Sequence, residues 1–272
     1  MQRGNALIRG RTLMKPERID IEQARRAGGL RIVTLAYVPS PWGEALKGIL
    51  HIKQLPHARV GHVFGSSTQT LQEWTAQDSF PVMAWNDERP RTTWIDQLYL
   101  AERLAPTPRL IPERLEDRIL MFGYCNELCG ENGIGWTDRI RGVHVQVTKP
   151  GGDPAGVSTY LGKKYGYTPE VGERAKQRVA AGLIAVAERL EQQRTRGSRF
   201  FIGDSLSAMD VYWAAFSNAL KPLAPELCPM PEMIREMFTT TEPTIVAATK
   251  PILIEHRDFI FKNYLELPVD LS

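Results

Sequence analysis

The sequence of 272 residues lacks several features that mark particular classes of protein. It has only three cysteines, Cys125, Cys129 and Cys228, an odd number without the spacing of a zinc site. Neither a disulfide framework nor a cysteine-bound metal is therefore expected, and a reducing compartment, the cytoplasm, suits the chain. The five histidines share no ligand spacing, so we expect no metal ion. No apolar run approaches the roughly 20 residues of a membrane-spanning helix, which argues against a membrane protein.

The charge of the sequence is nearly balanced. The 34 Lys and Arg residues against 31 Asp and Glu residues give a net charge of +3. Basic residues do not cluster with aromatic ones, so we expect no nucleic-acid partner. The hydrophobic content of 43% is ordinary for a globular protein with a full core. Since the chain exceeds a typical domain of roughly 100–150 residues, two domains are expected.

Residues 1–30 are predicted to be an N-terminal extension that is partly disordered and lies outside the fold. Residues 1–15 carry several basic side chains and no acid before Glu17, and they lack the apolar stretch of a signal peptide. An organelle-targeting leader is the alternative for this segment, and a natural start at Met14 would also explain it.

A first strand and helix are predicted directly after the extension. The run 31–38 is apolar and β-branched and too short for a buried helix, which predicts a central strand. From Trp42 the apolar residues recur with the period of a helix, which ends before Pro56. Ser40 stands at the N-cap position and Pro41 at the first helical position, where its missing N–H costs nothing.

The following pattern completes an α/β domain at 31–105. Strand patterns recur at 59–64 and 79–85, with a short helix between them. A last helix starts after Thr92 and Thr93, two residues suited to a helix cap. The strand-helix-strand order at the start predicts a parallel pair of strands joined by a right-handed crossover.

The remainder, 113–272, is predicted to be an all-helical domain behind a proline-rich linker at 105–112. Long amphipathic segments at 115–128 and 171–190 predict helices. The stretch 151–167 between them is rich in glycine and aromatic residues and is predicted to be a loop.

Three side chains of this half are expected to be structural. Cys125 and Cys129 are four residues apart on one helical face and are expected to pack in the core. Ser207 and Asp210 have the spacing of a capping box, with Asp in place of the commoner Glu or Gln, so Asp210 is expected to cap a buried helix.

Four motifs resemble those of the glutathione transferase family. Residues 40–43 (SPWG) stand where the related glutaredoxins carry Cys-Pro-Tyr-Cys, and residues 79–82 (SFPV) resemble the cis-proline segment of the thioredoxin fold. Residues 92–95 (TTWI) lie where the family carries Glu-Ser before a helix, and residues 201–210 resemble the capping segment of its helical domain. This resemblance over residues 31–220 implies an α/β thioredoxin-like N-terminal domain that binds glutathione, plus an all-α helical-bundle C-terminal domain.

The resemblance also implies a site for glutathione as co-substrate. Ser40 would stabilise its thiolate at a helix N-terminus, where free N–H groups and the helix dipole favour an anion. Plain helix capping is the alternative for Ser40, and Tyr37 is a rival hydroxyl that we expect to be packed in the core. Trp42 is implied to contact glutathione. A cis bond before Pro81 would leave the backbone of Phe80 free to pair with the cysteinyl part.

The γ-glutamyl end of glutathione is implied to lie at Thr92 and Thr93. Thr93 falls at the position of the family's serine and can donate a hydrogen bond to a carboxylate. Thr92 replaces the usual Glu or Gln and supplies no charge for the glutamyl ammonium group, so Asp78, Asp87 and Asp96 are candidate replacements. Helix capping is the alternative for both threonines.

Tyr124, Glu127 and Trp136 are candidates, by position alone, for the pocket of a second substrate. The resemblance implies an enzyme that adds the thiolate of glutathione to an electrophilic small molecule, with ether or carbon–halogen cleavage as a variant, detoxification as its general role and a homodimer as its assembly. The absence of cysteine at 40–43 disfavours redox chemistry through a protein thiol. A non-catalytic binding or regulatory protein of this fold, without glutathione binding, is the alternative class.

Overall fold

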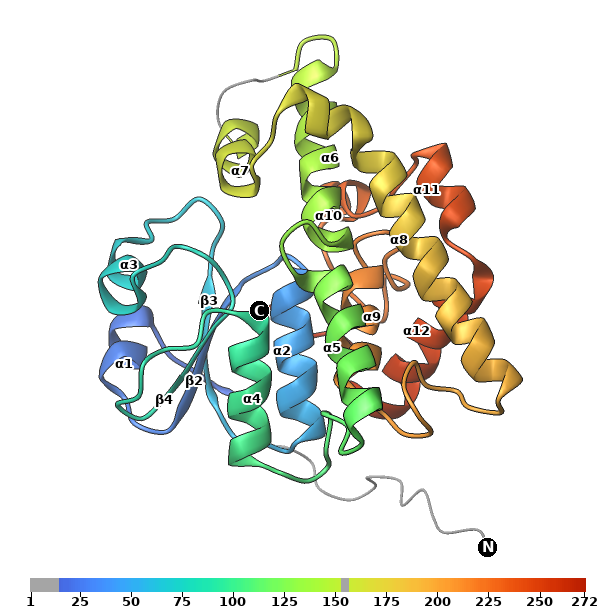
Figure 1. Ribbon diagram of the computed structural model, residues 1–272. Coiled ribbons are helices and arrows are strands. Elements are labelled where there is room, and N and C mark those ends of the chain that lie inside the picture. The colour runs from blue at the N-terminus through green and yellow to red at the C-terminus, as the bar shows by residue number, and fades with distance from the viewer. Residues whose placement is uncertain (1–14, 153–156) are drawn as a thin grey trace, which may run out of the picture.

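The computed structural model describes residues 15–152 and 157–272 (Figure 1). Positions 1–14 of the extension predicted at residues 1–30 lie outside the described residues. No helix in the described ranges is long and apolar enough to cross a membrane.

A four-stranded sheet organises the N-terminal half. Its strands are β1 (Glu17–Arg18), β2 (Leu30–Leu35), β3 (Ala58–His62) and β4 (Val82–Trp85). They lie in the order β1-β3-β2-β4, in which β1 and β2 run parallel to β3 and β4 runs antiparallel to β2. Four helices accompany the sheet: α1 (Ile21–Arg26), α2 (Pro41–Ile52), α3 (Gln69–Thr75) and α4 (Trp94–Leu104).

Successive residues of the strands face two different hydrophobic layers, as the period of two requires. Ile32 and Met83 belong to a large core that α2 and α4 share with the helical half. Val33 and Val82 belong to a smaller cluster that includes Leu71 of α3 and Ala24 of α1. Figure 1 shows the result: α2 and α4 lie between the sheet and the helical half, and α1 and α3 lie on the other face.

The helical half contains α5 (Leu115–Cys129), α6 (Ile134–Thr148), α7 (Val157–Tyr165), α8 (Pro169–Thr195), α9 (Ala208–Ser217), α10 (Glu232–Met237), α11 (Pro243–Ala248) and α12 (Pro251–Tyr264). Every residue of α9 is buried, and α9 packs against α2. Gly48 of α2 permits this approach, because a Cβ there would lie 3.2 Å from Cγ1 of Val211.

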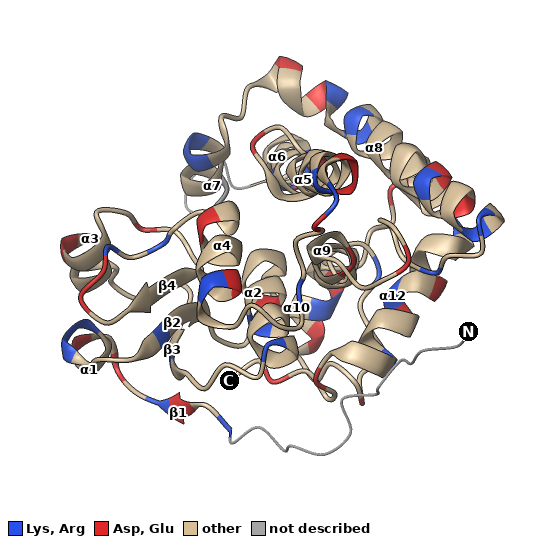
Figure 2. Cartoon of the chain, turned by 60° about the horizontal axis from the view of Figure 1, so that its bottom comes forward, with Lys and Arg blue, Asp and Glu red and all other residues tan. Residues whose placement is uncertain are grey.

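In Figure 2, acidic and basic residues are intermixed along α8 and α12 without a band of one sign.

The expected structural roles of the helical half are confirmed. The carboxylate of Asp210 accepts the N–H of Ser207 at 2.8 Å, forming the predicted capping box, and the N–H of Phe201 at 2.9 Å. Cys125 and Cys129 are buried, and burial raises the pKa of both thiols well above the ordinary value.

Residues 17–26, assigned to an extension outside the fold, are part of it. β1 pairs with β3, and Asp20 caps α1 by accepting the N–H of Gln23 at 2.7 Å. A strand of two residues has no detectable period, which is why the sequence pattern does not reveal it. The division at 105–112 stays a prediction, since Leu110 and Ile111 are buried in the core that both halves share.

The predicted loop at 151–167 is wrong in its second part, which forms α7. The aromatic residues that suggested irregular structure pack this helix: the ring of Tyr165 meets that of Trp136 edge-on, with 4.8 Å between centroids. Gly166, at φ +70°, follows the last residue of α7 in the left-handed conformation that commonly ends helices.

Candidate functional site

The segments that the resemblance singles out converge at the carboxyl end of β2. Val82, the first residue of β4, pairs with Val33 of β2 in antiparallel register. The preceding Phe80 and Pro81 therefore lie beside the last residues of β2. The chain leaves β2 at this end and reaches Ser40, the N-cap of α2, within five residues.

The start of α4 is held at the same place by a buried glutamine. Gln97 donates from Nε2 to the carbonyl oxygen of Pro81 at 2.8 Å and to that of Arg91 at 3.1 Å. Thr93, the N-cap of α4, thus begins its helix close to Pro81. Ser40, Phe80, Pro81 and Thr93 are brought to one edge of the sheet, as the resemblance implies.

Ser40 occupies the predicted N-cap position but does not cap. Its side chain makes no cap hydrogen bond, although its backbone carbonyl accepts the N–H of Glu44 at 2.8 Å. The residue is only 9% exposed. Its hydroxyl is therefore held at the positive end of the α2 dipole, not committed to the helix.

Trp42 is directed toward the helical half. Its indole N–H donates to the carbonyl oxygen of Cys129 at 2.9 Å, and its ring meets Phe216 edge-on at 4.8 Å between centroids. These contacts use its one hydrogen-bond donor. A direct polar contact of Trp42 with glutathione stays a prediction without geometric support.

Phe80 and Pro81 are joined by a cis peptide bond, as expected. Within the described ranges, neither the N–H nor the C=O of Phe80 takes part in a backbone hydrogen bond. The ring of Phe80 stacks on His62 of β3, with 4.6 Å between centroids, which fixes the segment. The backbone of Phe80 is therefore able to pair with an extended ligand.

Thr93 caps α4 with its hydroxyl. Its Oγ1 accepts the N–H of Asp96 at 3.3 Å and donates to Oδ2 of Asp96 at 2.8 Å. Thr92, half-buried, directly precedes it. Helix capping, the alternative role, thus holds for Thr93. The same contact places the carboxylate of Asp96 next to the Thr93 hydroxyl.

The other two candidate acids are placed differently. Asp78 accepts a hydrogen bond from the hydroxyl of Tyr160 of α7 at 3.0 Å, and Nζ of Lys164 lies 3.8 Å from its carboxylate. Asp87 is exposed in the turn after β4. Asp96 is therefore the candidate in direct contact with Thr93.

The three residues expected to line a second-substrate pocket have separate partners. The carboxylate of Glu127 is paired with Arg178 of α8, and the indole N–H of Trp136 donates to the carbonyl oxygen of Tyr165 at 3.0 Å. Tyr124 is half-buried against the large core. Their role stays a prediction.

Tyr37 is not packed in the core, contrary to expectation, because β2 ends at Leu35. The residue is 57% exposed and has φ +64°. It lines a cavity of about 570 Å³ together with Lys15, Pro229, Pro231 and residues 266–272. Sequence reasoning missed this cavity because its walls come from both ends of the chain.

The chain matches no family model and no curated protein. Solved structures do resemble it. A glutathione S-transferase from Methylobacillus flagellatus KT with glutathione bound aligns with a TM-score of 0.59 at 15% identity, over 86% of this chain and 95% of its own. One from Methylobacterium radiotolerans JCM 2831, in complex with glutathione sulfonate, gives 0.53 at 16% identity, over 81% and 94%.

The chain has the glutathione transferase fold. The same fold occurs in the nitrogen regulation fragment of the yeast prion protein Ure2p, with a TM-score of 0.54 at 11% identity, over 85% of this chain and 96% of that one. The predicted fold class, a thioredoxin-like α/β part followed by a helical part, is confirmed.

Proposed function

We propose that this chain is a glutathione transferase in which the hydroxyl of Ser40 stabilises the thiolate of glutathione. The observation that carries the proposal is the uncommitted hydroxyl at the start of α2, beside the unpaired backbone of Phe80. A serine hydroxyl donates one hydrogen bond, and such a bond favours thiolate over thiol. The neighbours that hold glutathione or its sulfonate support this choice of ligand.

The proposed reaction is nucleophilic attack by the glutathione sulfur. The thiol loses its proton to solvent, a carbon–sulfur bond forms at an electrophilic carbon, and the electron pair leaves with a departing group or enters the substrate in an addition. Ether and carbon–halogen cleavage are the variants in which the departing group is an alkoxide or a halide. Detoxification of such electrophiles is the proposed role.

The two ends of glutathione require different contacts. The backbone of Phe80 pairs with the cysteinyl part, and Thr92 and Thr93 lie at the γ-glutamyl end, where the N-terminus of α4 favours a carboxylate. Asp96 replaces the missing acid at position 92 and faces the glutamyl ammonium group. Its contact with the Thr93 hydroxyl, at 2.8 Å, supports this assignment.

The second substrate is proposed to enter beside the β2–α2 loop. The cavity of about 570 Å³ borders Tyr37, three residues before Ser40, and most of its wall is apolar: Pro229, Pro231, Leu267, Pro268, Val269 and Leu271. An apolar electrophile suits such a wall. Tyr124, Glu127 and Trp136 remain the alternative lining.

Replacing Ser40 tests the proposal. Ser40→Ala should lower conjugation of a model electrophile about 10- to 100-fold, equivalent to about 1.4–2.7 kcal/mol. The melting temperature should hardly change, because the hydroxyl makes no cap bond. Ser205→Ala, on an exposed serine, is the matched control. Full activity in Ser40→Ala would remove Ser40 from the mechanism.

The alternative is a binding or regulatory protein of the same fold. The uncharged Thr92 favours it, and the Ure2p fragment is named for regulation. The two functions differ in turnover. Glutathione that binds without conjugating any of a broad panel of electrophiles would favour the regulatory protein.

A homodimer through α4 and α5 is the proposed assembly. Leu115 and Ile119, one turn apart on α5, are each 62% exposed, and Tyr99 of α4 is exposed beside them, stacked on Phe122 of α5. Such an apolar strip is unfavourable in water unless it is covered. Ile119→Asp should convert the dimer to a monomer in light scattering, and a wild-type monomer would contradict the assignment.

A further inference from the structure

Residues 265–272, the C-terminal strap, lead from α12 back to the sheet. Val269 and Leu271 are each only 6% exposed and belong to a hydrophobic cluster with Phe261. The N–H of Val269 donates to the carbonyl oxygen of Leu227 at 2.8 Å. The strap is therefore a packed part of the fold that joins the helical half to β1 and β3.

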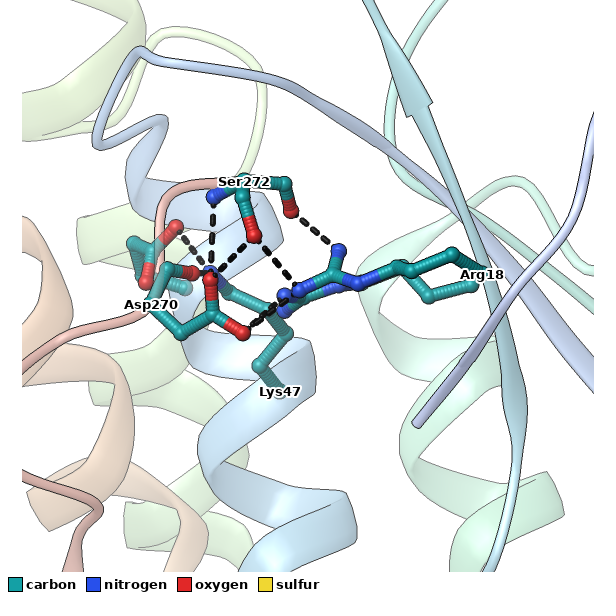
Figure 3. Close-up of polar contacts among 6 residues, drawn as sticks. Arg18, Lys47, Asp270 and Ser272 are labelled. Atoms are coloured by element: carbon teal, nitrogen blue, oxygen red, sulfur yellow. Dashed lines mark hydrogen bonds and ion pairs between the residues drawn. The ribbon is translucent and has the colours of Figure 1, made fainter. Parts of the chain in front are cut away.

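The carboxylate of Asp270 fixes the strap between two arginines from different strands. Figure 3 shows its contact with one of them, Arg18. Arg18 of β1 and Arg59 of β3 both donate to its Oδ2. The N–H and hydroxyl of Ser272 donate to the other oxygen, Oδ1, at 3.0 and 2.6 Å. Arg59 is only 3% exposed, so the loss of this carboxylate would leave a buried charge without its partner.

Asp270 is charged whenever the protein is folded near neutral pH. Burial raises its pKa, but the hydrogen bonds from Ser272 and the charges of Arg59 and Arg18 outweigh burial and lower the pKa to about 2. The arginine contacts are therefore charge-assisted hydrogen bonds, the stronger kind.

α2, the helix that directly follows Ser40, contacts the same segment. Nζ of Lys47, in the second turn of α2, donates to the carbonyl oxygen of Asp270 at 2.7 Å. Lys47 is itself paired with Glu44, also at 2.7 Å. Figure 3 shows Lys47 reaching the strap from α2, whereas Arg18 reaches it from a different direction.

Leu271, between Asp270 and Ser272, reaches the loop that carries the candidate catalytic hydroxyl. Its carbonyl oxygen accepts the N–H of Tyr37 at 2.6 Å. Tyr37 has φ +64°, a conformation that costs free energy for a residue with a side chain and that persists only where neighbouring contacts enforce it. The contact with the strap is such a constraint, three residues before Ser40.

We propose that Asp270 is a positioning residue for the transferase reaction. Its two arginine contacts hold the carbonyl of Leu271 against Tyr37, and the β2–α2 loop then holds the hydroxyl of Ser40 at the distance from the glutathione sulfur that a hydrogen bond needs. The inference rests on the proposed function, whereas the contact between strap and loop does not.

The test compares Asp270→Asn with Asp204→Asn, the same change on an exposed acid of the helical half. Hydrogen exchange of residues 36–41 reports the contact, since its amides include that of Tyr37. In Asp270→Asn we expect exchange of the Tyr37 amide to accelerate at least about 10-fold. We also expect kcat to fall about 10-fold with KM for glutathione changed less than about 3-fold, and the pKa of the bound glutathione thiol to rise.

Arg18→Met is the second variant, because Arg18 lies at the surface and its loss leaves Arg59 paired with Asp270. It should raise the exchange rate of the Tyr37 amide, lower kcat and raise the thiol pKa, each by less than Asp270→Asn does. Arg18→Lys should restore part of each change. Asp204→Asn should leave all three quantities at the wild-type values.

Two results would overturn the inference. Unchanged exchange in residues 36–41 of a folded Asp270→Asn protein would show that the strap does not hold the loop. Faster exchange with unchanged kcat and thiol pKa would show that the strap only stabilises the fold. A third outcome separates the inference from the proposed function. If the wild type neither binds nor converts glutathione, but exchange at residues 36–41 is still faster in Asp270→Asn than in wild type, the proposed function is wrong and the contact between strap and loop stands.

Discussion

The C-terminal strap and α7 both contact the N-terminal half near the candidate site, and they do so very differently. Val269 and Leu271 of the strap are buried, and the half-buried carboxylate of Asp270 between them lies against two arginines, of which Arg59 is buried. The α7 contact includes a hydrogen bond from Tyr160, itself 43% exposed, and the 3.8 Å pair of Lys164 with Asp78.

Because the two contacts differ in burial and charge, they should restrain the two neighbouring segments of the site to different degrees. The strap touches the loop that carries Ser40, whereas α7 touches Asp78, two residues before Phe80. Exposed ion pairs contribute little and open readily, whereas buried charge pairs are costly to break. The β2–α2 loop, which carries Ser40, should therefore be rigid, and the segment that leads from Asp78 to Phe80 should be adjustable.

The largest effect is expected from Asp270→Ala. Removing the carboxylate leaves Arg59 buried without its partner and should lower the free energy of unfolding by about 3 kcal/mol. The midpoint of denaturant unfolding measures this loss. A change below about 0.5 kcal/mol would remove the distinction between the two contacts.

The two contacts should fail at opposite ends of the pH scale. The pKa of Asp270 falls from 3.8 to about 2, so its stabilisation is complete above pH 3.8 and disappears as pH falls through 2. Burial, then the hydrogen bond to Asp78 and its charge, raise the pKa of Tyr160 from 10.0 to about 12. The stabilisation from Tyr160 is therefore complete below pH 10 and disappears as pH rises toward 12.

Titration of the two variants against wild type separates these effects. The stability difference between wild type and Asp270→Asn should shrink only at acid pH, and that between wild type and Tyr160→Phe only above pH 10. A difference for Tyr160→Phe that vanishes at acid pH would mean that Asp78, not the phenol, controls the α7 contact.

The smallest effect is expected from Tyr160→Phe at neutral pH. Loss of one half-exposed hydrogen bond should lower the free energy of unfolding by less than about 1 kcal/mol. Hydrogen exchange in residues 76–80 should nevertheless accelerate, because Asp78 loses its hydrogen bond from Tyr160 of α7. Unchanged exchange there, with Tyr37 unaffected as the internal control, would show that α7 does not restrain this segment.

Local signals predicted the part of the site that lies on helix starts. Pro41 and the change of period at Trp42 predicted where α2 begins, and Thr93 marked the start of α4. The cis bond before Pro81 followed from the resemblance. In each case the deciding information lies within a few residues of sequence.

The rest depends on contacts that no local pattern carries. Arg18 and Asp270 are 252 residues apart, and neither differs from a surface charge in the sequence. The exposure of Tyr37 depends on the end of β2 at Leu35, which cannot be located within the apolar run 31–38. It also depends on the contact of Tyr37 with Leu271, which is remote in sequence. The hydroxyl of Ser40 is free because of side-chain geometry, which a capping pattern cannot distinguish from a cap.

Calorimetric titration with reduced glutathione is the most direct test of glutathione binding at this site. We expect a dissociation constant between micromolar and low millimolar for the wild type, weaker binding in Thr93→Ala and wild-type binding in Thr93→Ser, which keeps the hydroxyl. Absence of binding up to about 10 mM, a free energy smaller than roughly 3 kcal/mol, would contradict glutathione chemistry at this site.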